Sequence, residues 1–386
     1  MTIYPIAQAN PPPGVIDFGL GQPDPALWPL SLLRQAADHR LSQGDGALLA
    51  YGIEPGDGYF REALAQFLSQ GYGVPVDPEH LMVSNGNSQA LDFVCTHFSQ
   101  PGDTVFVEEP TYFLALQILA DYHLNIVSIP VDPHGLRLDV LEAKLAEHQP
   151  TFLYTIPTFH NPTGVTLSAE RRVQLIRLSE QHNFLIVADE VYQLLWYTTP
   201  PPPPLMHYDQ AGTVISLGTF SKILAPGLRL GWIQARPERL APLLASGMVE
   251  SGGGLNPFTT GIVRSVLELG LQTEYLTYLR QTYRNRLSVL AQALHEEVPG
   301  FSFIEPAGGY FIWGSLAQEV DTQVLLVPAA QGGVAFQPGL KSSSNGGLRN
   351  YLRLSFAYYD EAQLREGVRR LAGVAGSLKR IGDCVV

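Results

Sequence analysis

Cysteine and basic residues are scarce in this chain of 386 residues. The two cysteines, Cys95 and Cys384, leave no spacing for a disulfide framework or a zinc site. Lys and Arg total 24 against 36 Asp and Glu, which gives a formal net charge of −12. Nucleic acids and anionic membranes both require a basic face. We therefore expect no metal, no nucleic acid and no membrane among the partners.

The sequence also lacks long hydrophobic runs and a secretion signal. No run of about eighteen uncharged apolar residues occurs, and residues 1–19 contain no basic segment followed by an apolar one. The glycine patterns of dinucleotide-binding and P-loop proteins are missing as well. These absences predict a cytoplasmic protein that binds neither dinucleotides nor nucleoside triphosphates through those motifs.

Hydrophobic residues make up 45% of the chain, enough for two domains. Between residues 81 and 230, short β-rich runs alternate with amphipathic helical stretches, which favours an α/β fold with a mostly parallel sheet covered by helices. The expected strands lie at residues 104–109, 125–130, 151–157, 184–190 and 213–220.

The remaining segments predict the domain organisation. A periodic stretch at 273–297 is long enough for a helix that connects two domains, and short β-rich segments follow it. We expect a large cofactor-binding domain at 46–272 and a smaller α+β domain at 273–386. Residues 1–45 hold a proline-rich arm and one helix, too little for a core, so we expect them to pack on the small domain.

Candidate reactive groups concentrate at residues 216–232, SLGTFSKILAPGLRLGW, which follow a predicted strand. Hydroxyl groups, one lysine and one arginine occur there in a short turn interrupted by Gly and Pro. A lone lysine on such a turn is usually a surface residue whose apolar stem packs against its neighbours. A chemical role for Lys222 therefore needs support from other segments.

The segment VADEVYQLLW supplies part of that support, because an apolar strand ends there in Asp189 and Glu190. Doubly wound sheets bind ligands at such strand ends, and a buried acid needs a cationic partner. The partner is either remote in the chain or a ligand cation such as a protonated pyridine nitrogen. Capping of a helix is the ordinary alternative for Asp189.

Two turns complete the set. In LMVSNGNSQALDFVCTHF, a tight turn at Gly86 precedes a helix whose first turn contains Asn87 and Ser88. Free amides at a helix start suit a phosphate, although most such junctions are only capped turns. In PTFHNPTG, Asn161 lies in a rigid proline-flanked loop, which by itself predicts only a turn.

Taken in order, these segments resemble the fold-type I pyridoxal-phosphate enzymes of the class I/II aminotransferase family, in particular the branch of 2-aminoadipate and multisubstrate aminotransferases. The resemblance extends over nearly the whole chain. It implies an aminotransferase-like three-layer αβα large domain, pyridoxal 5'-phosphate as cofactor, and ping-pong transfer of an amino group from an L-amino acid to a 2-oxo acid. The matching motifs are GLGQPDPALWP, AYGIEPGDGYFREAL, SNGNSQALD, EEPTYF, HNPTG, ADEVY, FSKILAPGLRLGW, GGYFIW, FQPG and YLRLSF.

The resemblance also implies roles at the cofactor ring. Lys222 would form an imine with the cofactor aldehyde and later move the proton of the substrate Cα. Asp189 would keep the pyridine nitrogen protonated. Tyr112 would stack on the ring, while Asn161 and Tyr192 would donate hydrogen bonds to its phenolate oxygen. Ordinary core packing is the alternative for both tyrosines.

Further implied roles concern the phosphate and the substrate. Arg353 would bind the substrate α-carboxylate, with Asn161 and Gly21 beside it, and its alternative is an arginine on a surface strand. Tyr51 matches a residue that reaches the phosphate of the neighbouring subunit, which implies a homodimer with shared active sites. The implied phosphate ligands within one subunit are Gly86, Asn87, Ser88, Thr219, Ser221 and Arg229.

The chain departs from the family at several positions. The phosphate turn, at residues 86–89, reads Gly-Asn-Ser-Gln instead of Gly-Ser-Gln-Gln, His160 replaces a glutamine, and Thr219 stands where serine is usual. None of these changes removes a required group. Prolines at 11–13 and apolar residues at 15–16 stand where many members of this branch have a helix with an arginine for side-chain recognition. This favours neutral aromatic or aliphatic substrates, or a broad range.

Two other functions are compatible with the same residues. A carbon-sulfur β-lyase would use the same cofactor and the same three residues, Lys222, Asp189 and Arg353, because the fold leaves the choice of broken bond to substrate orientation. A non-catalytic pyridoxal-phosphate-binding regulator that lacks its DNA-binding domain is the second alternative. The acidic composition disfavours the regulator.

Overall fold

A single large sheet organises the chain in the computed structural model, which describes residues 11–382, with side chains through residue 374. The sheet has eight strands in the order β2-β9-β8-β7-β6-β3-β4-β5. These strands are β2 (Leu81–Ser84), β3 (Thr104–Glu109), β4 (Asn125–Asp132), β5 (Gly135–Leu136), β6 (Phe152–Thr155), β7 (Leu185–Asp189), β8 (Val214–Thr219) and β9 (Gly231–Ala235).

The sheet is mostly parallel, as the alternating pattern predicts. Parallel pairing joins β4 to β3, β3 to β6, β6 to β7 and β7 to β8. Strand β9 runs antiparallel to both β8 and β2, so β2 points in the same direction as β8. The carboxyl ends of β2, β3, β6, β7 and β8 therefore meet at one edge, where open α/β sheets bind ligands.

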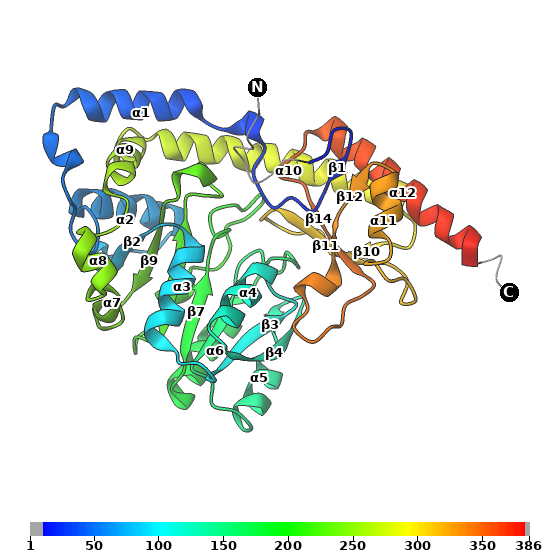
Figure 1. Ribbon diagram of the computed structural model, residues 1–386, viewed down its shortest axis with the longest axis horizontal. Helices are drawn as coiled ribbons and strands as arrows, with labels where there is room; N and C mark the ends of the chain where they lie inside the picture. The colour runs from blue at the N-terminus through cyan, green and yellow to red at the C-terminus, as the bar shows by residue number, and fades with distance from the viewer. Residues whose placement is uncertain (1–10, 383–386) are drawn as a thin grey trace.

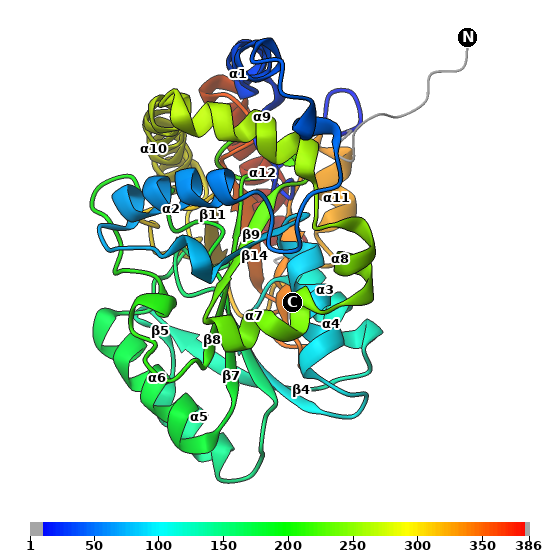
Figure 2. The same ribbon diagram turned by 90° about the vertical axis from the view of Figure 1, so that its left-hand side faces the viewer.

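Helices cover both faces of the sheet because successive strand residues point to opposite sides. In β7, Val187 packs in the core that contains α3 (Asn87–Phe98) and α4 (Phe113–Asp121). Ile186 and Ala188 pack instead in the core of α5 (Leu138–Leu145) and α6 (Ala169–His182). The sheet is thus the middle of three layers, and Figures 1 and 2 show helices on either side of it.

The C-terminal part contains a smaller antiparallel sheet in the order β10-β11-β14-β13. Its strands are β10 (Ser302–Phe303), β11 (Phe311–Ser315), β13 (Gln337–Pro338) and β14 (Tyr351–Ser355). The 27-residue helix α10 (Leu271–Glu297) packs against α12 (Glu361–Gly382), and α11 (Leu326–Gln331) lies beside them (Figure 1). Across residues 11–382, every helix is too short or too polar to cross a bilayer.

The N-terminal arm and its helix pack in two different places. Strand β1 (Ile16–Asp17) pairs with β12 (Val334–Ala335) of the C-terminal part. Helix α1 (Leu30–Ser42) instead lies along α9 (Pro257–Glu268), within the range expected for the large domain (Figure 1). Arg40 contributes to this packing, since its guanidinium donates to the Gly261 carbonyl at 3.0 Å and pairs with the Glu268 carboxylate at 2.7 Å.

Three further α-helices and several short 3-10 helices complete the fold of residues 11–382. The α-helices are α2 (Gly58–Tyr72), α7 (Pro237–Leu244) and α8 (Gly247–Gly252). Short 3-10 helices occur at η1 (Pro25–Leu27), η2 (Gly46–Leu49), η3 (Pro78–His80), η4 (Leu205–His207), η5 (Pro226–Leu228) and η6 (Gly339–Ser342).

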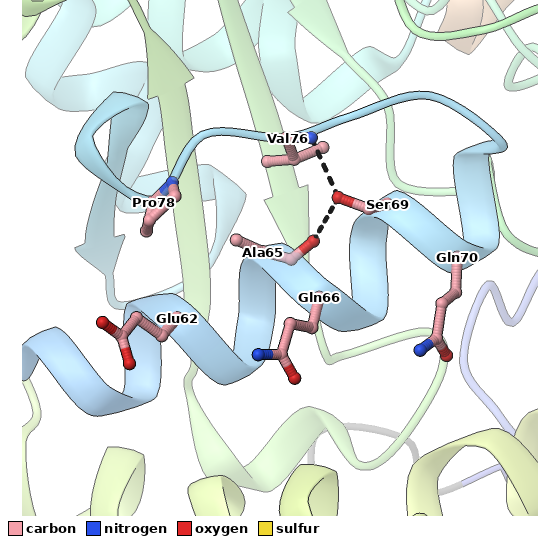
Figure 3. A pocket seen from close by; sticks show the side chains of 7 residues that line it. All are labelled: Glu62, Ala65, Gln66, Ser69, Gln70, Val76 and Pro78. Atoms are coloured by element: carbon pink, nitrogen blue, oxygen red, sulfur yellow. Dashed lines mark hydrogen bonds between the residues drawn. The ribbon is translucent and has the colours of Figure 1, made fainter.

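A surface pocket of about 420 Å³ lies against α2. Its wall includes Glu62, Gln66 and Gln70 on one side of the helix, and the Ser69 hydroxyl bridges the Val76 amide and the Ala65 carbonyl (Figure 3). None of the predicted site residues lines this pocket. The candidate site lies elsewhere, at the carboxyl edge of the large sheet.

Candidate active site

Asp189 ends β7 with a buried carboxylate whose hydrogen-bond partners are neutral. Its Oδ1 accepts from the Asn87 amide at 2.5 Å, and its Oδ2 accepts from the Tyr154 hydroxyl at 2.6 Å. Burial raises the pKa of this carboxyl, while the two hydrogen bonds and nearby Lys222 oppose the rise. Turns, and not a helix, follow β7, so the ordinary capping role for Asp189 is wrong.

Glu190, the next residue, points to the other face of the sheet and has a structural partner. Its carboxylate accepts from the Ser216 hydroxyl and from the Leu205 amide, and the Arg172 guanidinium of α6 lies 3.8 Å away. Glu190 therefore has a cationic partner in the chain, Arg172, whereas the hydrogen-bond partners of Asp189 are neutral. Asp189 is the one that can receive a ligand cation.

Tyr154 is a site residue that our sequence interpretation missed. It lies on β6 opposite Val187 of β7, so its side chain shares the face on which Asp189 lies two residues later. The alternation of side chains along β6 could have placed Tyr154 on this face, but only if the register between β6 and β7 had been known. The Asn87 side chain has a contact that was not predicted, with Asp189, while its backbone amide lies at the start of α3, where the phosphate was expected.

Lys222 follows β8 in a turn that faces Asp189. Its Nζ donates to the Gly21 carbonyl at 2.8 Å and lies 5.6 Å from the ring centre of Tyr310. Burial first, and then the charge of Arg353, lower the pKa of this amine to about 8, although Asp189 opposes them. Near neutral pH a useful fraction of Lys222 is therefore the nucleophilic neutral amine, which is not the property of an ordinary surface lysine.

Tyr310, which the sequence interpretation also missed, holds the backbone of this turn. Its hydroxyl donates to the Lys222 carbonyl at 2.7 Å. The residue precedes β11 in the GGYFIW motif, so the C-terminal part of the chain contacts the turn that carries Lys222. The motif could be identified in the sequence, but the contact of Tyr310 with the Lys222 turn could not be predicted from it.

A group of donors lies where β2 and β8 end. Arg229 has a left-handed backbone, with φ of 46°, and its side chain donates to the Asn85 carbonyl at 2.9 Å and to the Ser221 hydroxyl at 3.5 Å. The Thr219 hydroxyl lies 3.0 Å from that of Ser221. Gly86 has a φ of 85° and a ψ of 170°, a backbone conformation that is essentially confined to glycine, so this turn requires a glycine.

Helix α3 begins in the same place without a side-chain cap. Gly86 is its N-cap residue, and Asn87 and Ser88 form its first turn. The amides of such a turn point away from the helix and attract anions. Together with Arg229 and two hydroxyl groups, they form a site with the chemistry that a phosphate requires.

Arg353 lies on β14 and is buried, with 2% of its surface exposed, so its alternative as a surface arginine is wrong. Its guanidinium donates to the Asn161 side chain at 2.9 Å and to the Gly19 carbonyl at 2.7 Å, and it lies 4.0 Å from the ring centre of Phe311. Its Nε is buried without a hydrogen-bond partner among the described residues. A buried cation with a free donor suits a carboxylate ligand.

Two predicted tyrosines complete the same site. Tyr192 is buried, and its ring meets the edges of Tyr310 and Phe311. Tyr112 is half-buried at the start of α4, and burial, followed by the charge of Asp189, raises the pKa of its hydroxyl to about 12. Both charges that act on these hydroxyls, Asp189 and Arg353, belong to the site.

Gly21 and Tyr51 have contrasting positions. A Cβ on Gly21 would approach the Phe311 ring at 3.2 Å and the Arg353 guanidinium at 3.7 Å, so this glycine lies against the site. Tyr51 is 85% exposed and lies beside Gly253 on the surface. Of the predicted site residues, Tyr51 is the one that the described chain does not bring to the others.

The sequence matches the family model described as aminotransferase class I and II over residues 13–371. The chain belongs to this family. It is 37% identical to the aromatic-amino-acid aminotransferase 1 of Thermococcus litoralis over 93% of this chain and 87% of that protein. It is a pyridoxal-phosphate-dependent aminotransferase of the α/β class.

Solved structures agree with this assignment. The multiple substrate aminotransferase of Thermococcus profundus superimposes with a TM-score of 0.89 at 36% identity, over 95% of this chain and 93% of that one. The α-aminoadipate aminotransferase of Thermus thermophilus, in complex with N-(5'-phosphopyridoxyl)-L-leucine, has a TM-score of 0.86 at 32% identity over 96% of this chain and 94% of that one.

The two alternative functions are not favoured by these comparisons. An HTH-type transcriptional regulator of Bacillus subtilis also matches this aminotransferase, at 28% identity over 96% of this chain and 76% of the regulator. Its identity is lower than the 32–37% of the aminotransferases described above.

The residues of the site fit pyridoxal phosphate on structural grounds. The cofactor has an aldehyde, a basic pyridine nitrogen and a phosphate. The site has a lysine amine of lowered pKa, a buried carboxylate with neutral partners, and an uncapped helix start beside Arg229. Each group of the cofactor thus has a chemically matched partner.

Replacing Tyr154 with phenylalanine tests the hydrogen bond to Asp189. The change removes a donor that lowers the pKa of a carboxyl which burial already raises. A larger fraction of Asp189 is then protonated at low pH. We expect the acid limb of the kcat–pH profile to move to higher pH by about one unit.

Tyr197→Phe is the control, because it also removes a buried hydroxyl, one that donates a hydrogen bond to the Gly309 carbonyl. An unmoved limb in Tyr154→Phe, or equal shifts in both variants, contradicts the assignment.

Proposed function

We propose that this aminotransferase takes the amino group of neutral L-amino acids with aromatic or aliphatic side chains and transfers it to a 2-oxo acid by a ping-pong mechanism. The observation that carries the proposal is the buried Asp189 carboxylate, which receives neutral hydrogen bonds on both oxygens and faces Lys222. This pair fits a cofactor that carries a pyridine nitrogen at one end of its ring and an aldehyde on the other side.

Each residue at the ring has a distinct role in the proposal. Bound pyridoxal phosphate supplies an electron-withdrawing ring that accepts the electron pair of a broken bond at the substrate Cα. Lys222 would move the proton at the substrate Cα, and its lowered pKa suits proton transfer near neutral pH. Asp189 would hold the pyridine nitrogen protonated. Tyr112 would stack on the ring, and Asn161 and Tyr192 would donate hydrogen bonds to its phenolate oxygen.

Separate groups of the site would bind the phosphate and the α-carboxylate. The phosphate would be held by the amides of Gly86, Asn87 and Ser88 with the side chains of Thr219, Ser221 and Arg229. Arg353 binds the α-carboxylate, with Asn161 and Gly21 beside it, because its guanidinium is buried and has a free Nε donor. These two anchors orient the substrate so that its Cα lies near Lys222.

The surroundings of Arg353 support a neutral substrate side chain. Phe311, Tyr310 and Tyr192 form an aromatic cluster beside it. The arm at residues 19–28 contains no Lys or Arg, and its one acid, Asp24, is paired with Arg286 at 2.6 Å. This arm therefore offers no cation to a second carboxylate, which is costly to bury without one.

Half-reactions with single amino acids test both the reaction and the substrate class. We expect L-phenylalanine or L-leucine to change the cofactor absorbance with a second-order rate constant at least about tenfold above that of 2-aminoadipate. A following 2-oxo acid should restore the spectrum and yield one equivalent of a new amino acid, and Lys222→Ala should do neither. Release of ammonia without need of an oxo acid would instead indicate a lyase, and preference for 2-aminoadipate would contradict the substrate class.

The second part of the proposal is a homodimer in which Tyr51 reaches the partner's phosphate site. Tyr51 is exposed, and its segment lies against residues 253–254. Large apolar side chains of the neighbouring segments are exposed as well, and exposed apolar side chains are typical of an interface. These residues are Leu49, Ile53, Met248 and Phe258.

Tyr51→Phe tests this arrangement. Because the phenol would bond a phosphate of the partner subunit, its loss should raise the Kd for pyridoxal phosphate by about tenfold or more. Tyr59→Phe is the matched control, since Tyr59 is also exposed but stacks with Arg264 of its own chain. Sedimentation should give twice the 42.2 kDa mass of one chain. A monomer that binds the cofactor tightly, or a Tyr51→Phe variant of native affinity, would contradict shared sites.

A further inference from the structure

A clasp outside the catalytic groups joins the segment that carries Tyr112 to the C-terminal part of the chain. Glu109, at the end of β3, directs its carboxylate at residues 343–344. Its Oε1 accepts from the Ser343 hydroxyl at 2.5 Å, and its Oε2 accepts from the Ser344 amide at 2.9 Å and the Ser344 hydroxyl at 2.8 Å. Both oxygens of one carboxylate thus hold a loop that lies more than 230 residues away in the sequence.

The clasp continues along the backbone toward Tyr112. The Thr111 amide donates to the Ser342 carbonyl at 2.9 Å. Beyond Tyr112, the Phe113 and Tyr112 rings pack in a T-shaped arrangement with 5.5 Å between their centres. The Lys341 ammonium lies 5.2 Å from the centre of the Phe113 ring. Residues 341–344 therefore contact the chain on both sides of Tyr112, whereas Tyr112 itself faces the site.

The same loop is connected to the strand that carries Arg353. The Gln337 side chain donates to the Ser342 hydroxyl at 3.2 Å, and Gln337 lies opposite Arg353 in the β13–β14 pair. Gln337 therefore connects the strand of Arg353 to the loop at 341–344. That loop in turn contacts the segment of Tyr112.

We propose that Glu109 is a positioning residue that sets the Tyr112 ring against the cofactor by holding Ser343 and Ser344. The inference rests on the proposed role of Tyr112 as the residue on the ring face. Glu109 does not touch the cofactor or the substrate in this arrangement. It acts through Tyr112, and it links the ring-facing residue to the part of the chain that carries the carboxylate-binding Arg353.

A double-mutant cycle in the apoprotein tests this inference, with the Kd for pyridoxal phosphate measured by quenching of intrinsic fluorescence. We expect Tyr112→Ala to raise the Kd about tenfold, because a stacked aromatic face is lost. Glu109→Gln should raise it about fivefold, because neutral hydrogen bonds are weaker than charge-assisted ones. In the Tyr112→Ala background, Glu109→Gln should cause almost no further change, since the residue through which it acts is gone.

Two controls separate positioning from a general loss of stability. Glu268→Gln removes another clasp, between α9 and Arg40 of α1, and should lower the melting temperature but leave the Kd and the circular dichroism of the cofactor band unchanged. Ser344→Ala opens the Glu109 clasp from the other side and should reproduce the effect of Glu109→Gln on both readouts. It also provides a second variant if Glu109→Gln folds poorly.

The outcomes distinguish this inference from the proposed function. If Tyr112→Ala leaves the Kd unchanged, the proposed role of Tyr112 fails and the inference fails with it. If Tyr112→Ala weakens binding but Glu109→Gln and Ser344→Ala do not, the role of Tyr112 stands and the inference is overturned. Independent, multiplicative effects in the double variant overturn it as well.

Discussion

The contact between the Asp189 carboxylate and its neutral donors is the constraint on which the site depends. A buried carboxylate is costly unless hydrogen bonds or a cation stabilise its charge. Asn87 and Tyr154 provide the hydrogen bonds from α3 and β6, and Lys222 is the cation of the chain whose charge acts on it. The arrangement leaves a buried carboxyl group that can form an ion pair with a protonated pyridine ring.

The parallel sheet makes this arrangement possible because it gathers separate segments at one edge. Strands β2, β3, β6, β7 and β8 end there, and each is followed by residues of the site. The C-terminal part closes the site from outside, since β14 brings Arg353 to Asn161 and the Tyr310 hydroxyl holds the turn of Lys222. The arm adds the carbonyl groups of Gly19 and Gly21, which accept from Arg353 and Lys222.

Much of this was predictable from the sequence, because the relevant residues lie in short motifs that also specify local structure. Asp189 ends an apolar run, Gly86 precedes an amphipathic helix, and Lys222 lies in a Gly/Pro-interrupted turn. The alternation of β-rich and helical segments predicted the sheet, and the resemblance to a known family predicted most of the residues now found around Asp189 and Arg353. The roles of those residues remain predictions.

Contacts that depend on three-dimensional register could not be predicted in this way. Tyr154 reaches Asp189 only because β6 and β7 pair in one particular register. The backbone of Asn87 was expected at a phosphate turn, but the contact of its side chain with Asp189 depends on how α3 meets β7. Helix α1 packs on α9, where the buried Arg40 has its partners, and no local pattern of the arm reveals these partners.

Nitrogen-15 NMR of the holoenzyme, prepared with ring-labelled pyridoxal phosphate, tests the central claim most directly. We expect a chemical shift typical of a protonated pyridine nitrogen in the native protein at neutral pH. In Asp189→Asn we expect a shift typical of the unprotonated nitrogen, because the neutral amide cannot stabilise the ring cation. An unprotonated nitrogen in the native protein, or a protonated one in Asp189→Asn, would contradict the account.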